Sequence, residues 1–207
     1  MILIIIKKRK EPESILMLNR GLKRIRKRRR DMELELRNIE QGYQAECQLD
    51  FYLERIGINS NDVVLLQDLR LPAADRQSFF QIDNLLLTAH FAVNIDVKSQ
   101  PGTFTFQNNA RNFQYALHGK KYGMMHPISQ VEEQCDQLRS WLGTQWENYP
   151  IVNLVALADP NAEIVTDSSS DWVYDWVMPF ALLKKSFKRN SHVAPPKRYL
   201  SRYGQLL

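Results

Sequence analysis

Apolar and polar positions fall into a clear pattern between residues 81 and 99, QIDNLLLTAHFAVNIDVKS. Two apolar runs flank a short connection, which predicts two antiparallel strands. Because successive strand residues face opposite sides of a sheet, Asp96 and Lys98 should share one face, and the apolar residues that alternate with them should share the other. If the connection holds two or four residues, antiparallel pairing places Asp83 directly opposite Asp96.

Upstream of this hairpin, the spacing of apolar residues predicts helices and one further strand. Apolar residues recur every three or four positions from Pro12 and again after Gly42, which marks a predicted helix boundary. VVLLQDLRL at 63–71 predicts a strand. The opening MILIIIKKRK is too short to span a bilayer and lacks the charge order of a signal peptide. It predicts an edge strand or a docking segment, with contact to a membrane surface as the alternative.

Downstream of the hairpin, residues 102–122 predict short strands broken by glycines. Their aromatic side chains are expected in the core or in cross-strand pairs rather than on a base-stacking platform. Pro127 begins a predicted helix, and the continuous apolar run 151–158 predicts a strand buried on both faces. Residues 168–180 predict a capped helix, and a basic tail follows.

The positive charge of the chain favours an anionic binding partner. The formal net charge is +5, and RGLKRIRKRRR at 20–30 is the densest basic run. Such a run is ordinarily a solvated helix face, yet like charges this close repel unless an anion relieves them, so phosphate binding stands beside that interpretation. The candidate contacts to a nucleic-acid backbone are Arg24, Arg26, Arg28, Arg29, Arg30, Lys120 and Lys121.

The charged residues of the hairpin have a chemistry of their own. Two directly opposed carboxylates, with Cβ atoms about 5 Å apart, repel each other unless a cation offsets them. Mg²⁺ suits such a pair, because it prefers oxygen ligands and takes one or two protein carboxylates beside a substrate phosphate. The carbonyl of Val97 would add a ligand, and Lys98 would orient water or stabilise charge on phosphorus. The pattern therefore indicates phosphodiester hydrolysis.

Cysteine and histidine content excludes other chemistries. Cys47 and Cys135 cannot build a disulfide framework and form no C-x-x-C pair, so two buried thiols in a reducing cytoplasm are expected. The four histidines show no paired helical spacing, which argues against a zinc site. There is no adenylate-binding glycine loop, so any coupling to a motor would require a separate chain.

The same residues resemble a known family. An acid on one strand followed by D/E-x-K at the end of the next resembles the PD-(D/E)xK nuclease superfamily. More closely, Glu46 in YQAECQLDFYL, then QIDNLLL, IDVKS, and HPISQ with Gln130 resemble the nuclease-related domain (NERD) over residues 42–158. Where that family usually has Gly-Glu, a glutamate in the triplet and Asn-Pro, this chain has Ala45-Glu46, Asp96 and His126-Pro127.

The resemblance implies a mixed α/β fold with a restriction-endonuclease-like core, in which a mostly antiparallel sheet is flanked by helices. The region of resemblance predicts a nuclease domain (42–160), and the charge and apolar pattern on either side predicts a basic N-terminal arm or helix (1–41) and a C-terminal helix with a basic tail (161–207). The implied cofactor is Mg²⁺ or Mn²⁺, with Asp83, Asp96, the Val97 carbonyl and Glu46 as ligands. The implied catalytic residues are Glu46, Asp83, Asp96, Lys98, Gln100 and Gln130.

Three of these residues have a simpler interpretation as well. Glu46 lies at the border of an apolar helix stripe, where a salt bridge is the ordinary role. Gln100 follows Lys98 by two positions and would be an edge-strand polar residue if it does not bind water or phosphate. Gln130 would be an exposed residue of a first helical turn if it does not contact the acids.

The function that these observations favour is a metal-dependent nuclease in the cytoplasm. The alternative is a catalytically degenerate module that binds nucleic acid and acts in DNA processing or as an adaptor. The expected partner is nucleic acid, DNA rather than RNA. A homodimer and a separate helicase or motor chain are both compatible with the sequence, and no transmembrane segment is expected.

Overall fold

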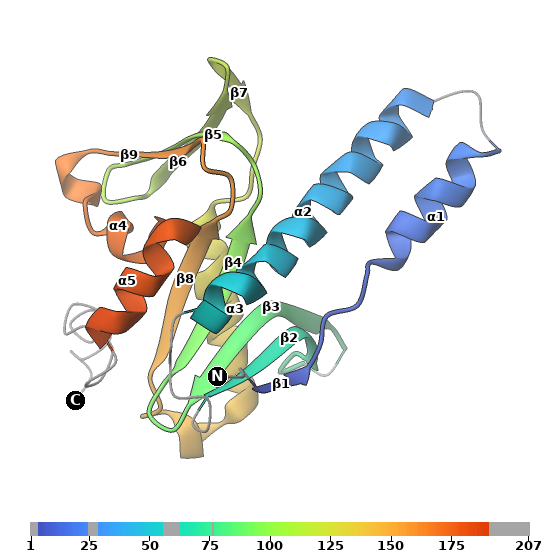
Figure 1. Cartoon of the computed structure of the whole chain (residues 1–207). Helices are drawn as coiled ribbons and strands as arrows, with labels where there is room; N and C mark the ends of the chain where they lie inside the picture. The colour runs from blue at the N-terminus through green and yellow to red at the C-terminus, as the bar shows by residue number, and fades with distance from the viewer. Residues whose placement is uncertain (1–3, 25–28, 56–62, 76, 191–207) are drawn as a thin grey trace.

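A computed structural model of the chain describes residues 4–24, 29–55, 63–75 and 77–190. These residues form five helices and ten strands, arranged as Figure 1 shows. The helices are α1 (Glu13–Leu22), α2 (Arg29–Arg55), α3 (Pro127–Leu142), α4 (Val173–Trp176) and α5 (Phe180–Asn190). The strands are β1 (Ile4–Lys7), β2 (Val63–Pro72), β3 (Phe79–Thr88), β4 (Ala92–Lys98), β5 (Gly102–Gln107), β6 (Asn112–Leu117), β7 (Lys120–Tyr122), β8 (Ile151–Leu157), β9 (Ala162–Thr166) and β10 (Val177–Pro179).

The strands form two mixed sheets. The larger has the order β1-β2-β3-β4-β8-β10, and the smaller has the order β7-β6-β5-β9. The antiparallel meander β2-β3-β4 forms the centre of the larger sheet, and β8 returns beside β4 in parallel. The predicted mixed α/β fold, with a mostly antiparallel core flanked by helices, is confirmed: α2, the meander, α3 and β8 follow one another in that order.

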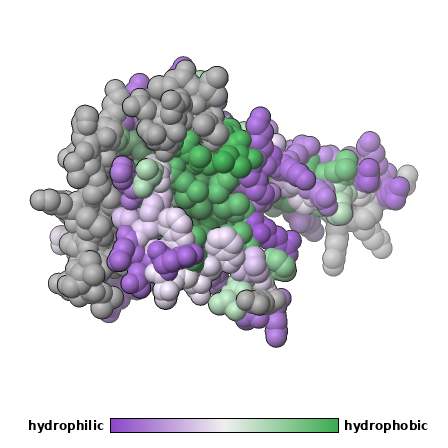
Figure 2. All heavy atoms as spheres, turned by 90° about the horizontal axis from the view of Figure 1, so that it is seen from below, coloured by the Kyte–Doolittle hydropathy of each residue, from purple (hydrophilic) through white to green (hydrophobic). Residues whose placement is uncertain are grey.

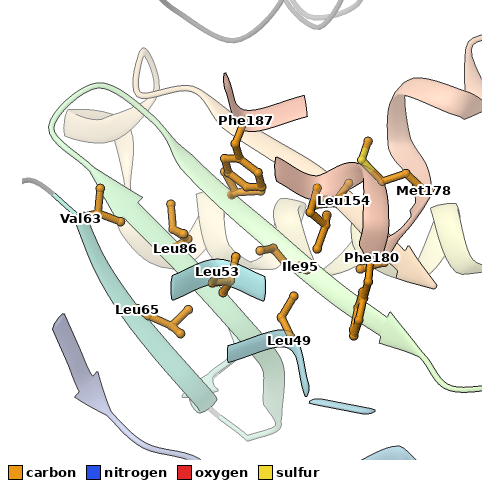
Figure 3. Close-up of a cluster of buried hydrophobic side chains, with 13 residues drawn as sticks. Leu49, Leu53, Val63, Leu65, Leu86, Ile95, Leu154, Met178, Phe180 and Phe187 are labelled. Carbon is orange, nitrogen blue, oxygen red and sulfur yellow. The ribbon is translucent and has the colours of Figure 1, made fainter. Parts of the chain in front are cut away.

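Helices cover both faces of the larger sheet, and strand alternation determines which residues face which helix. Val93 and Ile95 of β4 pack in one apolar cluster with residues of α2 and α5 (Figure 3). Asn94 faces the other side, where its Nδ2 donates to the Val131 carbonyl of α3 over 3.2 Å. Asp96 and Lys98 follow Asn94 at two-residue steps, so they lie on the α3 side, as the sequence predicted.

The predicted hairpin between β3 and β4 has the shorter of the two possible connections. Thr88 N donates to the Phe91 carbonyl over 2.9 Å, and Ala89 and His90 form the two-residue tip. The last recorded pair of this ladder is Asn84 with Ile95. Continued by one step, the same register would set Asp83 opposite Asp96, just beyond the last pair of the ladder.

The regular alternation of β2 and β3 breaks beside that point. Asp68 has a φ of 51°, a left-handed conformation that Asp adopts more readily than most residues. In the register of β2 and β3, Asp68 and Asp83 are the two residues between the pairs Gln67–Asn84 and Leu69–Ile82. Ile82 and Leu85 are three residues apart, yet both pack in the same apolar cluster, which regular alternation would not allow. The break therefore redirects the side chains of β3 at the candidate site.

Helices α1 and α2 pack side by side as a hairpin that extends from the body of the molecule (Figure 1). The predicted helix boundary at Gly42 is wrong, because α2 runs without interruption from Arg29 to Arg55. Tertiary contacts outweigh the low helix propensity of glycine here, since Ala45, Leu49 and Leu53 on the same helix are buried against the sheet.

Two further expectations need correction. Residues 168–180 do not form one capped helix: a 3₁₀ turn (Ser168–Ser170), the short α4 and strand β10 precede α5, which begins at Phe180. Cys47 is exposed on α2, whereas Cys135 is buried as expected. The aromatic residues of β5 and β6 do pack in a core cluster, as predicted. The basic tail after residue 190 lies outside the described residues.

The surface seen in Figure 2 has an apolar area at the centre of the lower face, with hydrophilic residues around it. The hairpin of α1 and α2, at the right of that view, is mostly hydrophilic. Strand β1, at the edge of the larger sheet, exposes Ile6. Across the described parts of the chain, no helix combines the length and apolar character needed to cross a membrane.

Candidate active site

The centre of the candidate site is a contact between three side chains. Lys98 Nζ lies 2.9 Å from Asp96 Oδ2 and donates to Gln130 Oε1 over 2.8 Å. Gln130 Nε2 in turn donates to Asp96 Oδ1 over 3.1 Å. The Asp96 side chain is 2% exposed and that of Lys98 is 14% exposed. The fold thus brings three of the predicted catalytic residues into mutual contact.

The N-terminus of α3 holds Gln130 in this position. Pro127 occupies the first helical turn, where a missing N–H costs nothing. His126 caps the helix: its Nδ1 accepts a hydrogen bond from Ser129 N, and its Nε2 donates to the Ala110 carbonyl over 2.8 Å. The His-Pro pair therefore serves the start of the helix and lies one turn before Gln130.

Glu46, on α2, forms an ion pair with a residue that the sequence analysis did not single out. Arg9 follows β1, and its Nη1 donates to Glu46 Oε2 over 3.2 Å. Its Nη2 donates to Asp50 Oδ1 over 3.2 Å and to Asn84 Oδ1 over 2.6 Å. The simpler interpretation of Glu46, a salt bridge, is therefore part of the observed structure.

The acids nevertheless influence one another. The pKa of Glu46 is raised to about 7, first by burial and then by the charge of Asp83, while Arg9 lowers it. Burial also raises the pKa of Asp96 to about 6, against the lowering effect of Lys98. The pKa of Asp83 is raised, again first by burial, while Lys98 lowers it. Burial is the largest cause of all three raised pKa values, so a cation bound beside these acids would favour their ionised forms and lower those values.

A comparison with known families now bears on this geometry. A family model, the nuclease-related domain, matches residues 41–158, which is more than half of the chain. The chain belongs to the nuclease-related domain family. The wider context of this family is the PD-(D/E)xK superfamily. No curated protein and no solved structure matches the chain.

In this nuclease-related domain, the candidate ligands for a hard cation such as Mg²⁺ are the carboxylates of Asp83 and Asp96. The described residues contain no group of three or more His, Cys, Asp or Glu side chains arranged to hold a metal ion. Extending the β3–β4 register one step beyond its last pair, Asn84 with Ile95, would bring Asp83 and Asp96 together, and two carboxylates are what Mg²⁺ usually takes from a protein. Asp96 Oδ2 is buried and lies 2.9 Å from Lys98 Nζ, so a cation at this oxygen would share it with the lysine.

Two other predicted site residues, Val97 and Gln100, belong to the same segment as Asp96 and Lys98. Val97 packs toward the α2 side with its side chain, between Asp96 and Lys98. Gln100 lies just beyond β4, and its Oε1 is buried without a hydrogen-bond partner. Neither residue has a recorded contact with the acids, so their roles stay predictions.

The candidate nucleic-acid contacts lie away from the acids. Arg24, Arg29 and Arg30 are exposed near the tip of the α1–α2 hairpin, and Lys120 and Lys121 are exposed on β7. Lys120 Nζ lies 5.5 Å from the centre of the Tyr122 ring. Arg26 and Arg28 lie outside the described residues.

Sequence reasoning missed five residues around the acids. Arg9 lies in a short basic segment, KKRK. Nothing in the composition of that segment indicates which of its side chains is buried. Asp50 follows Glu46 by one helical turn, which is a usable signal for a shared face. The residues are Arg9, Asp50, Gln67, Asp68 and Asn84.

Proposed function

We propose that the chain is a metal-dependent nuclease that hydrolyses phosphodiester bonds of nucleic acid, with DNA as the first substrate to test. The single observation that carries this proposal is the contact of buried Asp96 with Lys98 and Gln130, one register step from Asp83. A buried carboxylate beside a lysine, at the end of two strands, is costly for folding and needs a functional reason.

Asp83 and Asp96 would hold Mg²⁺ or Mn²⁺, together with the Val97 carbonyl, and Glu46 would contribute negative charge. When bound, the cation supplies Lewis-acid stabilisation of charge on a phosphate oxygen. Lys98 is held by Asp96 and Gln130, so its ammonium group is fixed before substrate arrives. It would orient the attacking water and stabilise the charge that grows on phosphorus during in-line attack. Gln130 positions Lys98 and Asp96 at once.

Sequence-independent affinity would come from the exposed arginines of the hairpin and the lysines of β7. Such contacts neutralise phosphates and release counterions, so binding should weaken steeply as salt rises. The hairpin extends from the body of the molecule (Figure 1). It could therefore contact parts of a bound nucleic acid that lie outside the candidate active site. A reducing cytoplasm suits the two free cysteines.

A cleavage assay tests this proposal. Labelled single- and double-stranded DNA and RNA are incubated with the protein, with Mg²⁺ or with EDTA, beside the Asp83→Ala variant. We expect Mg²⁺-dependent fragments from at least one substrate, and a loss of at least about 100-fold in the variant, as for other residues that stabilise a transition state. Binding, measured at fixed salt, should change by less than about twofold, because Asp83 makes no backbone contact of the kind that drives affinity.

A second candidate function has one observation in its favour. Arg9 already pairs with Glu46 and Asp50, which is the arrangement expected if the old site has become a structural ion pair. In that case the domain would bind nucleic acid without cutting it, in DNA processing or as an adaptor. Salt-dependent binding together with no cleavage of any of the four substrates would favour this module over the nuclease.

A further inference from the structure

The guanidinium group of Arg9 sits in a cage of oxygen atoms. Its two terminal nitrogens contact Glu46 Oε2, Asp50 Oδ1 and Asn84 Oδ1 at 3.2, 3.2 and 2.6 Å. Gln67 Nε2 donates to the same Asp50 oxygen over 2.6 Å, and its Oε1 accepts from Arg9 N over 3.3 Å. Carboxylate and amide oxygens that converge on one point are the ligands that hard divalent cations prefer.

Arg9 fills this cage tightly. Its side chain is only 5% exposed, and its Nε is buried without a hydrogen-bond partner. Burying a charged arginine with an unsatisfied nitrogen costs free energy. The attraction between the guanidinium group and the neighbouring carboxylates must offset that cost. Arg9 lowers the pKa of Glu46, of Asp50 and of Asp83, so its charge reaches both the cage and the hairpin.

The N-terminal segment that carries Arg9 is fixed to the sheet. β1 pairs in parallel with β2 at the sheet edge, and Lys7 Nζ donates to the carbonyls of Gln67 and Asp68. Arg9 lies two residues later and outside the part of the chain that the family model matches, residues 41–158. A segment beyond the family region thus completes the polar cluster.

The charges around the site favour a single divalent cation. Three basic groups, Lys7, Arg9 and Lys98, contact acids in this cluster through recorded ion pairs. When ionised, five carboxylates face these three cations, which leaves two negative charges for one doubly charged ion. The five are Glu46, Asp50, Asp68, Asp83 and Asp96.

We infer that Arg9 is a built-in cation that takes the place of a second metal ion at Glu46 and Asp50, so that the chain binds one divalent cation, at Asp83 and Asp96. This inference rests on the proposed function and sharpens it from one or two metals to one. Arg9 is then a positioning residue, which fixes Glu46 and supplies a permanent positive charge without exchange with solvent.

A calorimetric titration with Mn²⁺ alone, which measures the number of ions bound per chain, tests the inference. The full chain should bind one Mn²⁺, and Arg9→Ala should bind two, because the emptied cage offers two carboxylates and an amide oxygen. Arg9→Ala/Asp50→Asn should return to one. Arg70→Ala is the matched control and should stay at one, since Arg70 only stacks over the Phe79 ring at 5.1 Å.

The outcomes separate the inference from the proposed function. Two Mn²⁺ ions on the wild type, or one on a folded Arg9→Ala protein, would overturn the inference and leave the nuclease proposal standing. No site-dependent binding by the wild type would remove both. If Arg9→Ala unfolds without metal, circular dichroism gives a second readout: recovery of native helix signal in Mn²⁺ supports the cage as a cation site, and failure to recover at millimolar Mn²⁺ overturns it.

Discussion

Lys98→Ala is expected to lower metal-dependent cleavage by about 10³-fold, the size of effect seen when a group that stabilises transition-state charge is removed. Lys98 is the cationic side chain recorded in contact with Asp96, and Gln130 holds it from the other side. Its loss removes a preorganised ammonium group from the place where phosphorus gains charge. Binding of nucleic acid should change by less than about twofold, because a single buried lysine adds little to backbone affinity.

Metal binding separates this effect from a damaged fold. Lys98→Ala removes a positive charge beside Asp96, so Mn²⁺ affinity should stay equal or increase while cleavage falls. Lys184→Ala, at an exposed position of α5, is the matched control and should cleave at the wild-type rate. A Lys98→Ala protein with full activity would remove Lys98 from the mechanism.

Asp96→Asn is expected to abolish cleavage and to stabilise the metal-free protein at the same time. The pKa of Asp96 is raised from 3.8 to about 6, first because of burial. A carboxyl with a raised pKa in the folded state binds its proton more tightly there than in the unfolded state. It therefore lowers stability as pH rises from about 4 through 6, and the full penalty is present at pH 8. Asparagine carries no such charge.

The expected gain for Asp96→Asn at pH 8 is up to about 3 kcal/mol, from a shift of about two pKa units at 1.36 kcal/mol each. The gain should be well under about 1 kcal/mol at pH 4, because there the carboxyl is protonated in the folded state and only partly ionised in the unfolded state. Denaturant unfolding in EDTA at the two pH values measures it. Asp136→Asn, on the exposed side of α3, serves as the comparison and should change stability little. Equal destabilisation by Asp96→Asn at both pH values would contradict the assigned cost of the buried charge.

Local pattern was sufficient to predict the hairpin and its register. Alternation along IDVK determines which side chains of β4 share a face, and the two-residue connection at Ala89-His90 sets the observed β3–β4 register, which ends at Asn84 and Ile95, one step short of Asp83 and Asp96. The helix before the site and the buried strand after it follow from apolar spacing alone. These features depend on residues that are close in sequence, so a single sequence carries the information.

The rest of the site depends on contacts between distant segments. Arg9 reaches Asn84 across 75 positions of the chain, and no local pattern marks which residue of a basic run will be buried. The left-handed Asp68, which breaks the alternation beside Asp83, looks like any other strand residue in the sequence. Gly42 misled in the opposite direction, because packing of α2 on the sheet outweighs its low helix propensity.

A calorimetric titration of the metal-free protein with Mg²⁺ and then Mn²⁺, wild type beside Asp83→Asn, tests the central claim most directly. It asks whether the opposed carboxylates bind a cation, and it needs no knowledge of the substrate. We expect a saturable binding signal from the wild type that disappears in Asp83→Asn, while Asp136→Asn behaves as the wild type does. Identical isotherms for the wild type and Asp83→Asn would contradict the claim that Asp83 and Asp96 form the metal site.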